Sequence, residues 1–236
     1  MEREKVMNVY READRSMAFA TLMKNVYLWM TLGLGMTGLT AAYVAGNPGW
    51  MQTIFETRGL LFALLIGEVA LVWILSARIM KMSFATAGIM FAVYSILNGV
   101  TLSFIFLAYT MESIATTFFV TAGTFGAMTL VGYTVKKDLS GLGRFLIMAL
   151  IGLIIATLVN IFVASSTLSW TITYVGVLIF VGLTAYDTQK IKNMLREYGS
   201  EANEVTMKLA LMGSLTLYLD FINLFLYLLR ILGDRK

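Results

Sequence analysis

Seven apolar stretches, separated by short polar segments, run along this chain. We expect membrane-spanning helices over about residues 25–45, 59–80, 84–109, 113–135, 145–163, 168–188 and 207–232. Each is close to the roughly 20 residues that a helix needs to cross a bilayer. The residues from Lys190 to Lys208 form the longest internal connection, and we expect part of it to be helical. The pattern predicts an all-α membrane protein, a single seven-helix transmembrane domain over residues 25–236 preceded by a charged arm at residues 1–24.

The seventh stretch carries an acid, Asp220, in its middle. Small and polar side chains recur around it at spacings of three and four, so on a helix they form one stripe: Gly213, Thr216, Asp220, Asn223 and Tyr227. A carboxyl group facing lipid is costly, so we expect the stripe to face protein or trapped water. The plainer alternative is a packing seam closed by hydrogen bonds.

Composition supports the membrane class and narrows the chemistry. Of the 236 residues, 58% are hydrophobic and only 14% charged, and the mean hydropathy is +0.78. A soluble domain needs more charge than this to cover its surface. The chain has no cysteine and no histidine, which excludes disulfides, thiolate nucleophiles and metal sites or proton relays built on histidine. Any response to pH near neutrality must therefore come from carboxyl groups, and we expect no cofactor.

The positive charges predict an orientation. If the N-terminus lies inside, 14 of the 18 lysine and arginine residues fall in inside segments, which makes the 1–24 arm cytoplasmic. The net charge of +4 is small and spread over the loops, so we expect no nucleic-acid partner. The C-terminal end disagrees, because Arg230, Arg235 and Lys236 would lie outside. The last stretch therefore either spans, as its length favours, or re-enters and returns inside.

Two acids and one arginine belong to the same half of this bundle. Arg78 ends the second span and Asp187 ends the sixth, both towards the inside, and Asp220 enters the membrane from that side. Two carboxyl groups that meet in a low dielectric can share a proton, and an arginine can brace both. The alternative is a buried ion pair that only fixes helix register. Glu68, deep in the second span, can line a cavity, pair with Arg78 or hydrogen-bond a neighbouring helix.

Three further polar residues lie within predicted spans. Asn98, Asn160 and Asn223 are more typical of interhelical hydrogen bonding than of ion binding. If the protein conducts ions, we expect its pore or an internal cavity to be lined by polar side chains of the spans: Glu68, Asn98, Asn223, Tyr186 and Tyr227.

Two motifs carry a resemblance to a known family. YDTQKIK at residues 186–192 and SLTLYLDFINLFLYLLRILG at residues 214–233, with EVALVWILSARIMKMS from Glu68, resemble the Bax-inhibitor family of bacteria and eukaryotes. The resemblance implies a seven-helix protein that leaks cations, notably Ca²⁺, across its membrane in a pH-dependent way. It further implies that Asp187 and Asp220 form a proton-sensing pair, touched only transiently by Ca²⁺, and that an arginine of the second span latches the pair.

The resemblance assigns the latch to Arg78, but the second span departs from the family pattern. It reads Arg78-Ile79-Met80-Lys81, where relatives can carry several basic residues in a row. In a bacterium the location would be the inner membrane, and the partners would be the lipid bilayer, Ca²⁺ and protons. Family members also imply a second role, as non-conducting modulators of other membrane proteins such as a membrane-bound AAA protease.

An intramembrane aspartyl protease is the enzyme that this layout resembles. Tyr186-Asp187 followed by an acid on the next span matches it, and two carboxyl groups sharing a proton suit hydrolysis. Such proteases place Gly-x-Gly before the second acid, whereas Asp220 follows Leu-Tyr-Leu. We therefore expect a protein that is not an enzyme.

Overall fold

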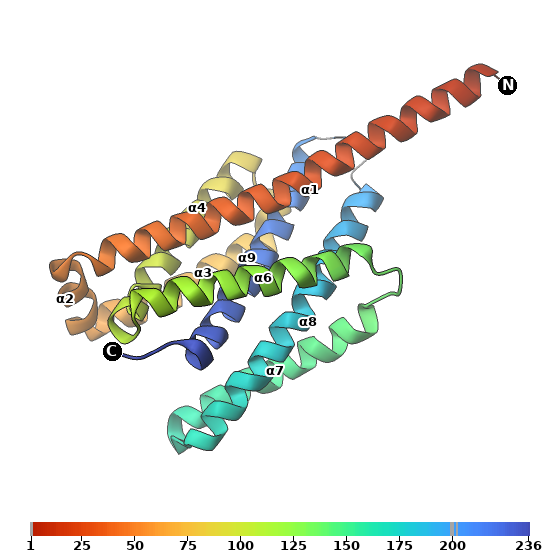
Figure 1. Cartoon of the computed structure of the whole chain (residues 1–236). Coiled ribbons are helices and arrows are strands. Elements are labelled where there is room, and N and C mark those ends of the chain that lie inside the picture. The colour runs from red at the N-terminus through yellow and green to blue at the C-terminus, as the bar shows by residue number, and fades with distance from the viewer. Residues whose placement is uncertain (1, 199–200, 202) are drawn as a thin grey trace. The chain divides into compact units, whose positions relative to one another are not determined.

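The computed structural model describes residues 2–198, 201 and 203–236, and every regular element within them is a helix. One isolated antiparallel bridge joins Tyr109 to Arg235. In chain order the elements are α1 (Glu2–Ala45), α2 (Pro48–Glu56), α3 (Arg58–Arg78), the 3₁₀ turn η1 (Ile79–Lys81), α4 (Phe84–Leu102), α5 (Ile105–Ala108), α6 (Met111–Thr134), α7 (Ser140–Val163), α8 (Ser166–Tyr198) and α9 (Glu204–Leu232) (Figure 1).

The predicted fold class is confirmed. Within the described residues, seven helices are long and apolar enough to cross a membrane, and they coincide with the seven predicted stretches. The helix that contains the first span is longer than expected, because α1 runs without a break from Glu2 through Lys24 to Ala45. Between the first two spans lies a further short helix, α2, whose first residue is Pro48, a position that suits proline.

The third stretch is broken near its end. The sequence predicts one span to residue 109, but α4 ends at Leu102 and α5 begins at Ile105. Between them the Ser103 hydroxyl donates to the carbonyl oxygen of Val100 at 2.7 Å. A serine that bonds back to its own helix in this way is a known cause of bending.

The chain divides into two compact units. The first contains residues 1–107 and 191–218, and the second contains residues 108–190 and 219–236. The helix α9 is shared along its length, with residues 204–218 in the first unit and residues 219–232 in the second.

In the first unit, α1 and α4 lie side by side (Figure 1). A Cβ atom on Gly99 would come within 2.5 Å of the Thr37 carbonyl oxygen, so only glycine allows this approach. At the next contact the Trp29 ring meets Phe91 edge-on at 6.4 Å between centroids. The backbones of α1 and α4 therefore approach closely at Thr37, as small residues in membrane helices allow.

The start of α9 is fastened to the turn between α3 and α4. The ammonium group of Lys208 donates to the carbonyl oxygens of Met80 at 3.4 Å and Met82 at 3.1 Å. A carboxylate oxygen of Glu204 accepts a hydrogen bond from the Phe84 amide at 3.1 Å. These bonds satisfy backbone groups at the end of one helix and the start of the next.

In the second unit, the C-terminal tail returns to the junction of α5 and α6. The Thr110 amide donates to the Asp234 carbonyl oxygen at 3.2 Å, and the Lys236 amide donates to that of Ala108 at 3.1 Å. The helix α9 that ends at this tail is a single helix of 29 residues, long and apolar enough to cross a membrane, as the spanning alternative for the last stretch expects.

Candidate functional site

The two predicted aspartates meet in the second unit. Asp187 lies in the second half of α8 and Asp220 near the middle of α9, and their side chains are hydrogen-bond partners. Both are buried, with 8% and 5% of their surface exposed. A carboxylate can only accept hydrogen bonds, so a hydrogen bond between two carboxyl groups requires a proton on one of them. The arrangement is therefore one in which the two acids could share a proton.

Close helix packing positions Asp187. Gly132 of α6 lies against the backbone carbonyl of Ala185, and Gly143 of α7 lies against the ring of Tyr186, so a Cβ atom on either glycine would overlap its neighbour. These two contacts lie just before Asp187 in the sequence and fix the rotation of α8 about its axis.

Gln189 adds a contact to which the sequence analysis assigned no role. Its side-chain oxygen accepts a hydrogen bond from the Leu139 amide at 2.8 Å, and its amide donates to the carbonyl oxygens of Lys137 at 2.9 Å and Val135 at 3.3 Å. One buried side chain thereby ties the loop between α6 and α7 to α8, two residues beyond Asp187. The sequence alone gives little sign of this role, because the hydrogen-bond partners of Gln189 are backbone groups far away in the sequence.

The charges around the pair are few. Lys190, exposed and one turn beyond Asp187, interacts electrostatically with it and lies 5.8 Å from the Tyr186 ring centre. One oxygen of Asp220, Oδ2, has no hydrogen-bond partner among the described residues. A protein site that binds Ca²⁺ tightly supplies most of roughly six to eight oxygen ligands. Among the described residues, no group of three or more acids lies close enough together to hold a metal ion. The pair therefore offers a cation a charge and two side chains, with the remaining ligands left to water.

Arg78, the predicted latch, is the last residue of α3, and its side chain is exposed. It belongs to the first unit, whereas both aspartates belong to the second. Its role as the latch stays a prediction.

Glu68 is the centre of a second polar site, in the first unit. The Thr101 hydroxyl donates to one of its carboxylate oxygens at 2.6 Å, and the Asn98 amide donates to the other at 3.3 Å. Of the three alternatives predicted for Glu68, the structure therefore shows hydrogen bonding to a neighbouring helix, α4. Its partner Asn98 also serves as an interhelical contact, as predicted.

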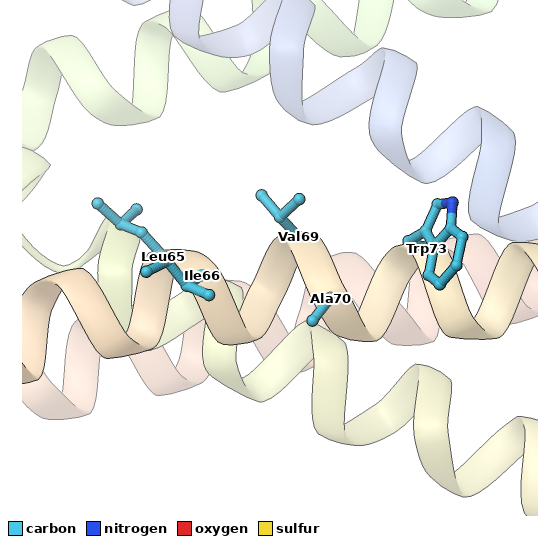
Figure 2. A pocket seen from close by; sticks show the side chains of 5 residues that line it. All are labelled: Leu65, Ile66, Val69, Ala70 and Trp73. Atoms are coloured by element: carbon cyan, nitrogen blue, oxygen red, sulfur yellow. The ribbon is translucent and has the colours of Figure 1, made fainter.

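The other side of α3 is entirely apolar. Figure 2 shows a shallow hollow whose lining residues all belong to this helix: Leu65, Ile66, Val69, Ala70 and Trp73. The indole nitrogen of Trp73 is the one polar side-chain atom of this set. Four of these side chains are large and exposed, as suits a lipid-facing surface. Glu68 thus points from α3 towards α4, and the apolar face is left for the bilayer.

Two further predicted lining residues, Asn223 and Tyr227, lie on α9. The Asn223 amide donates to the Leu219 carbonyl of its own helix at 2.8 Å. The ring of Tyr227 stacks on Phe180 of α8 at 5.8 Å between centroids and lies against Gly176. Asn160, predicted to bond between helices, accepts from the Ser165 amide at 3.0 Å and so caps the turn after α7.

A helical protein with several helices able to cross a membrane and with two acids that meet among its buried side chains defines a recognisable class. The model of one family, described as inhibitor of apoptosis-promoting Bax1, matches residues 20–236. The chain belongs to this Bax-inhibitor family, and the resemblance carried by its two motifs is confirmed.

Several curated bacterial proteins are similar along nearly the whole chain. The inner membrane protein YbhL of Escherichia coli K12 is 53% identical over 216 residues, which cover 92% of each chain. An uncharacterized protein of Deinococcus radiodurans is 42% identical, with 91% of each chain covered. An uncharacterized membrane protein of Streptococcus pyogenes is 35% identical, covering 95% of this chain and 96% of the relative. The protein is a multi-pass integral membrane protein, in keeping with the predicted location.

Proposed function

We propose that this protein is a pH-sensitive leak pathway for cations, Ca²⁺ in particular, and that the Asp187–Asp220 pair controls it. One observation supports the proposal most, namely two buried carboxyl groups, on α8 and α9, that interact with each other. Two carboxylates in that position repel each other, and a proton or a cation between them relieves the repulsion. The pair can therefore exchange a proton for a cation.

The latch is part of the same proposal. A guanidinium group that braces the ionised pair would hold α3 against it, and protonation of the pair would remove the charge that the arginine binds. Arg78 is the candidate, because its exposed side chain is not committed to another partner by any hydrogen bond or ion pair of the described residues. Protonation also removes the negative charge that attracts a cation, so flux need not rise steadily with acid.

The test is Ca²⁺ flux into proteoliposomes at several pH values. Asp220→Asn should abolish the pH-dependent part of the flux, because an amide cannot take up the proton. Arg78→Ala should shift the pH profile while leaving a pH-dependent flux. The matched control is Asp138→Asn in the loop after α6. Asp138 is exposed, and hydrogen bonds from Ser140 lower its pKa, so it stays ionised in mild acid and its loss should leave the profile unchanged.

Three outcomes would overturn the proposal. A pH profile that Asp220→Asn leaves intact would remove the pair from control of the flux. A well-folded protein that carries no flux would favour the non-conducting modulator. Cleavage of a helical membrane substrate that stops on mutation of either aspartate would instead establish the protease, in which the shared proton serves hydrolysis.

A further inference from the structure

We infer that Glu68 is a second proton-binding site, and that a proton on Glu68 reverses the direction of a hydrogen-bond chain that runs from α3 to α1. The chain passes through Asn98 of α4 and Tyr218 of α9 and ends at Thr37 of α1. All of these residues belong to the first unit. The inference is independent of the Asp187–Asp220 pair and of the proposed leak.

The geometry is that of a continuous chain. Asn98 Nδ2 donates to Glu68 Oε2 at 3.3 Å, and Asn98 Oδ1 lies 3.1 Å from the Tyr218 hydroxyl. That hydroxyl lies 2.7 Å from Thr37 Oγ1, which in turn lies 2.9 Å from the carbonyl oxygen of Ser95. Tyr218 is fully buried, with its ring edge-on to Phe91 and Tyr94, so water has no access to replace a missing partner.

The number of protons does not match the number of contacts. Thr37 and Tyr218 each carry one hydroxyl proton, but they take part in three close contacts: Thr37 with Ser95, Thr37 with Tyr218, and Tyr218 with Asn98. The two hydroxyl protons can fill only two of the three, and the third is filled only if Asn98 turns its amide nitrogen towards Tyr218. The same heavy-atom positions therefore admit two complete hydrogen-bond arrangements.

In the first arrangement Glu68 is ionised. Thr37 donates to Tyr218, Tyr218 donates to the Asn98 carbonyl oxygen, and the Asn98 amide donates to Glu68, while Thr101 donates to the other carboxylate oxygen. Every donor points towards the carboxylate. Each of its oxygens accepts one hydrogen bond, as a buried carboxylate without a cation requires.

In the second arrangement Glu68 carries a proton and the Asn98 amide is turned over. The Glu68 hydroxyl donates to the Asn98 oxygen, the Asn98 nitrogen donates to the Tyr218 hydroxyl, and Tyr218 donates to Thr37. Thr37 then uses the Ser95 carbonyl, which the structure already places within reach. Exchanging the oxygen and nitrogen of an asparagine moves no heavy atom appreciably, so both arrangements fit one structure.

The groups around Glu68 leave protonation as the way to neutralise its carboxylate. The titratable side chains that face Glu68 are Tyr94 of α4 and Tyr218 of α9. Among the described residues no lysine or arginine lies within ion-pair distance of it. On its own helix, Arg78 is ten residues away, about 15 Å at 1.5 Å per residue. A proton is thus the simplest way to neutralise Glu68, and Tyr218 is the group that reports it.

The experiment is an infrared pH titration of the purified full-length protein in detergent. In the wild type, the carboxyl band of protonated Glu68 should appear on acidification, and the phenol C–O band of Tyr218 should shift with the same midpoint, because its hydroxyl changes partner. Tyr218→Phe identifies the tyrosine band by its loss, and Tyr174→Phe, at an exposed tyrosine of α8, is the matched control. Asp220→Asn should leave both changes in place.

Glu68→Gln makes the sharpest variant, because an amide at this position donates to Asn98 and accepts from Thr101 as the protonated acid does. Its Tyr218 band should lie at the acid position at every pH. Thr37→Val combined with Ser95→Ala should do the opposite, since the two changes remove the other hydroxyl partners of Tyr218 and leave Asn98 as its acceptor, so its band should stay at the alkaline position. A Tyr218 band unaffected by either variant, or by acid in the wild type, would overturn the inference.

Discussion

At the scale of single residues, the contacts that hold the acid pair in place require a particular residue type more strictly than the pair itself does. Asp187 and Asp220 need only be acids that meet, whereas Gln189 satisfies three backbone groups of a loop 50 residues away with one side chain. The position requires both a donor and an acceptor at the end of a long side chain, which only glutamine combines at this length.

We therefore predict that Gln189→Leu lowers the free energy of unfolding by about 1–3 kcal/mol, because it leaves buried backbone groups without partners. Thermal unfolding in detergent measures the change. Gln52→Leu is the matched control, since Gln52 is exposed and, among the described residues, its side chain hydrogen-bonds Glu56 of its own helix. Equal effects at the two positions would show that the buried loop contacts contribute nothing.

At the scale of elements, the helices are held by close backbone approaches within the spans and by short polar connections at their ends. Gly99 against Thr37 and Gly132 against Ala185 are approaches of the first kind. Two polar connections hold the helix ends. Lys208 bonds to the turn after α3, and the tail after α9 bonds to the junction of α5 and α6. The tail is the clearest, because it pairs the two ends of the second unit's sequence.

From the position of the C-terminal tail we predict that two introduced cysteines will form a disulfide. Tyr109 and Arg235 face each other as a non-hydrogen-bonded antiparallel pair, whose Cα atoms are about 4.5 Å apart, and this spacing suits a disulfide. Because the chain contains no cysteine, Tyr109→Cys with Arg235→Cys should form one intramolecular disulfide under mild oxidation, detected by its shift on a non-reducing gel. Tyr133→Cys with Arg235→Cys, which uses the far end of α6, should not. Failure of the first pair would contradict the tail's position.

At the scale of the whole molecule, the prediction is topology. The charge bias places Met1 and the loops at Lys136 and Lys190 inside, and Asn47 and Lys236 outside. Single cysteines at these positions, labelled by an impermeant reagent from each side of the membrane, test it. Position 110 should label from the same side as position 236, because the tail bonds to it. Labelling of position 236 from the cytoplasm alone would reverse the C-terminal half of the assignment.

The sequence by itself determined the seven spans and the membrane class, because the length of an apolar run depends only on the neighbouring residues. It also identified Asp187, Asp220 and Glu68, since an acid within an apolar run is visible wherever its partners lie. The stripe predicted on α9 was right in that Asp220 is buried. However, α9 is buried on other faces as well, at Leu217 and Leu224 among others, so the surface of α9 that faces protein is wider than one stripe.

Only the tertiary structure decided which groups those acids meet. The partners of Glu68 come from α4 and are extended by α9 and α1, up to 181 residues apart in sequence at Thr37 and Tyr218. The roles of Gln189 and Asn160 depend on backbone groups that any sequence would offer. Such contacts arise from the rotation and spacing of packed helices, which no local pattern records, and they bring isolated polar residues together as a buried pair of acids and a chain of hydrogen-bonded side chains.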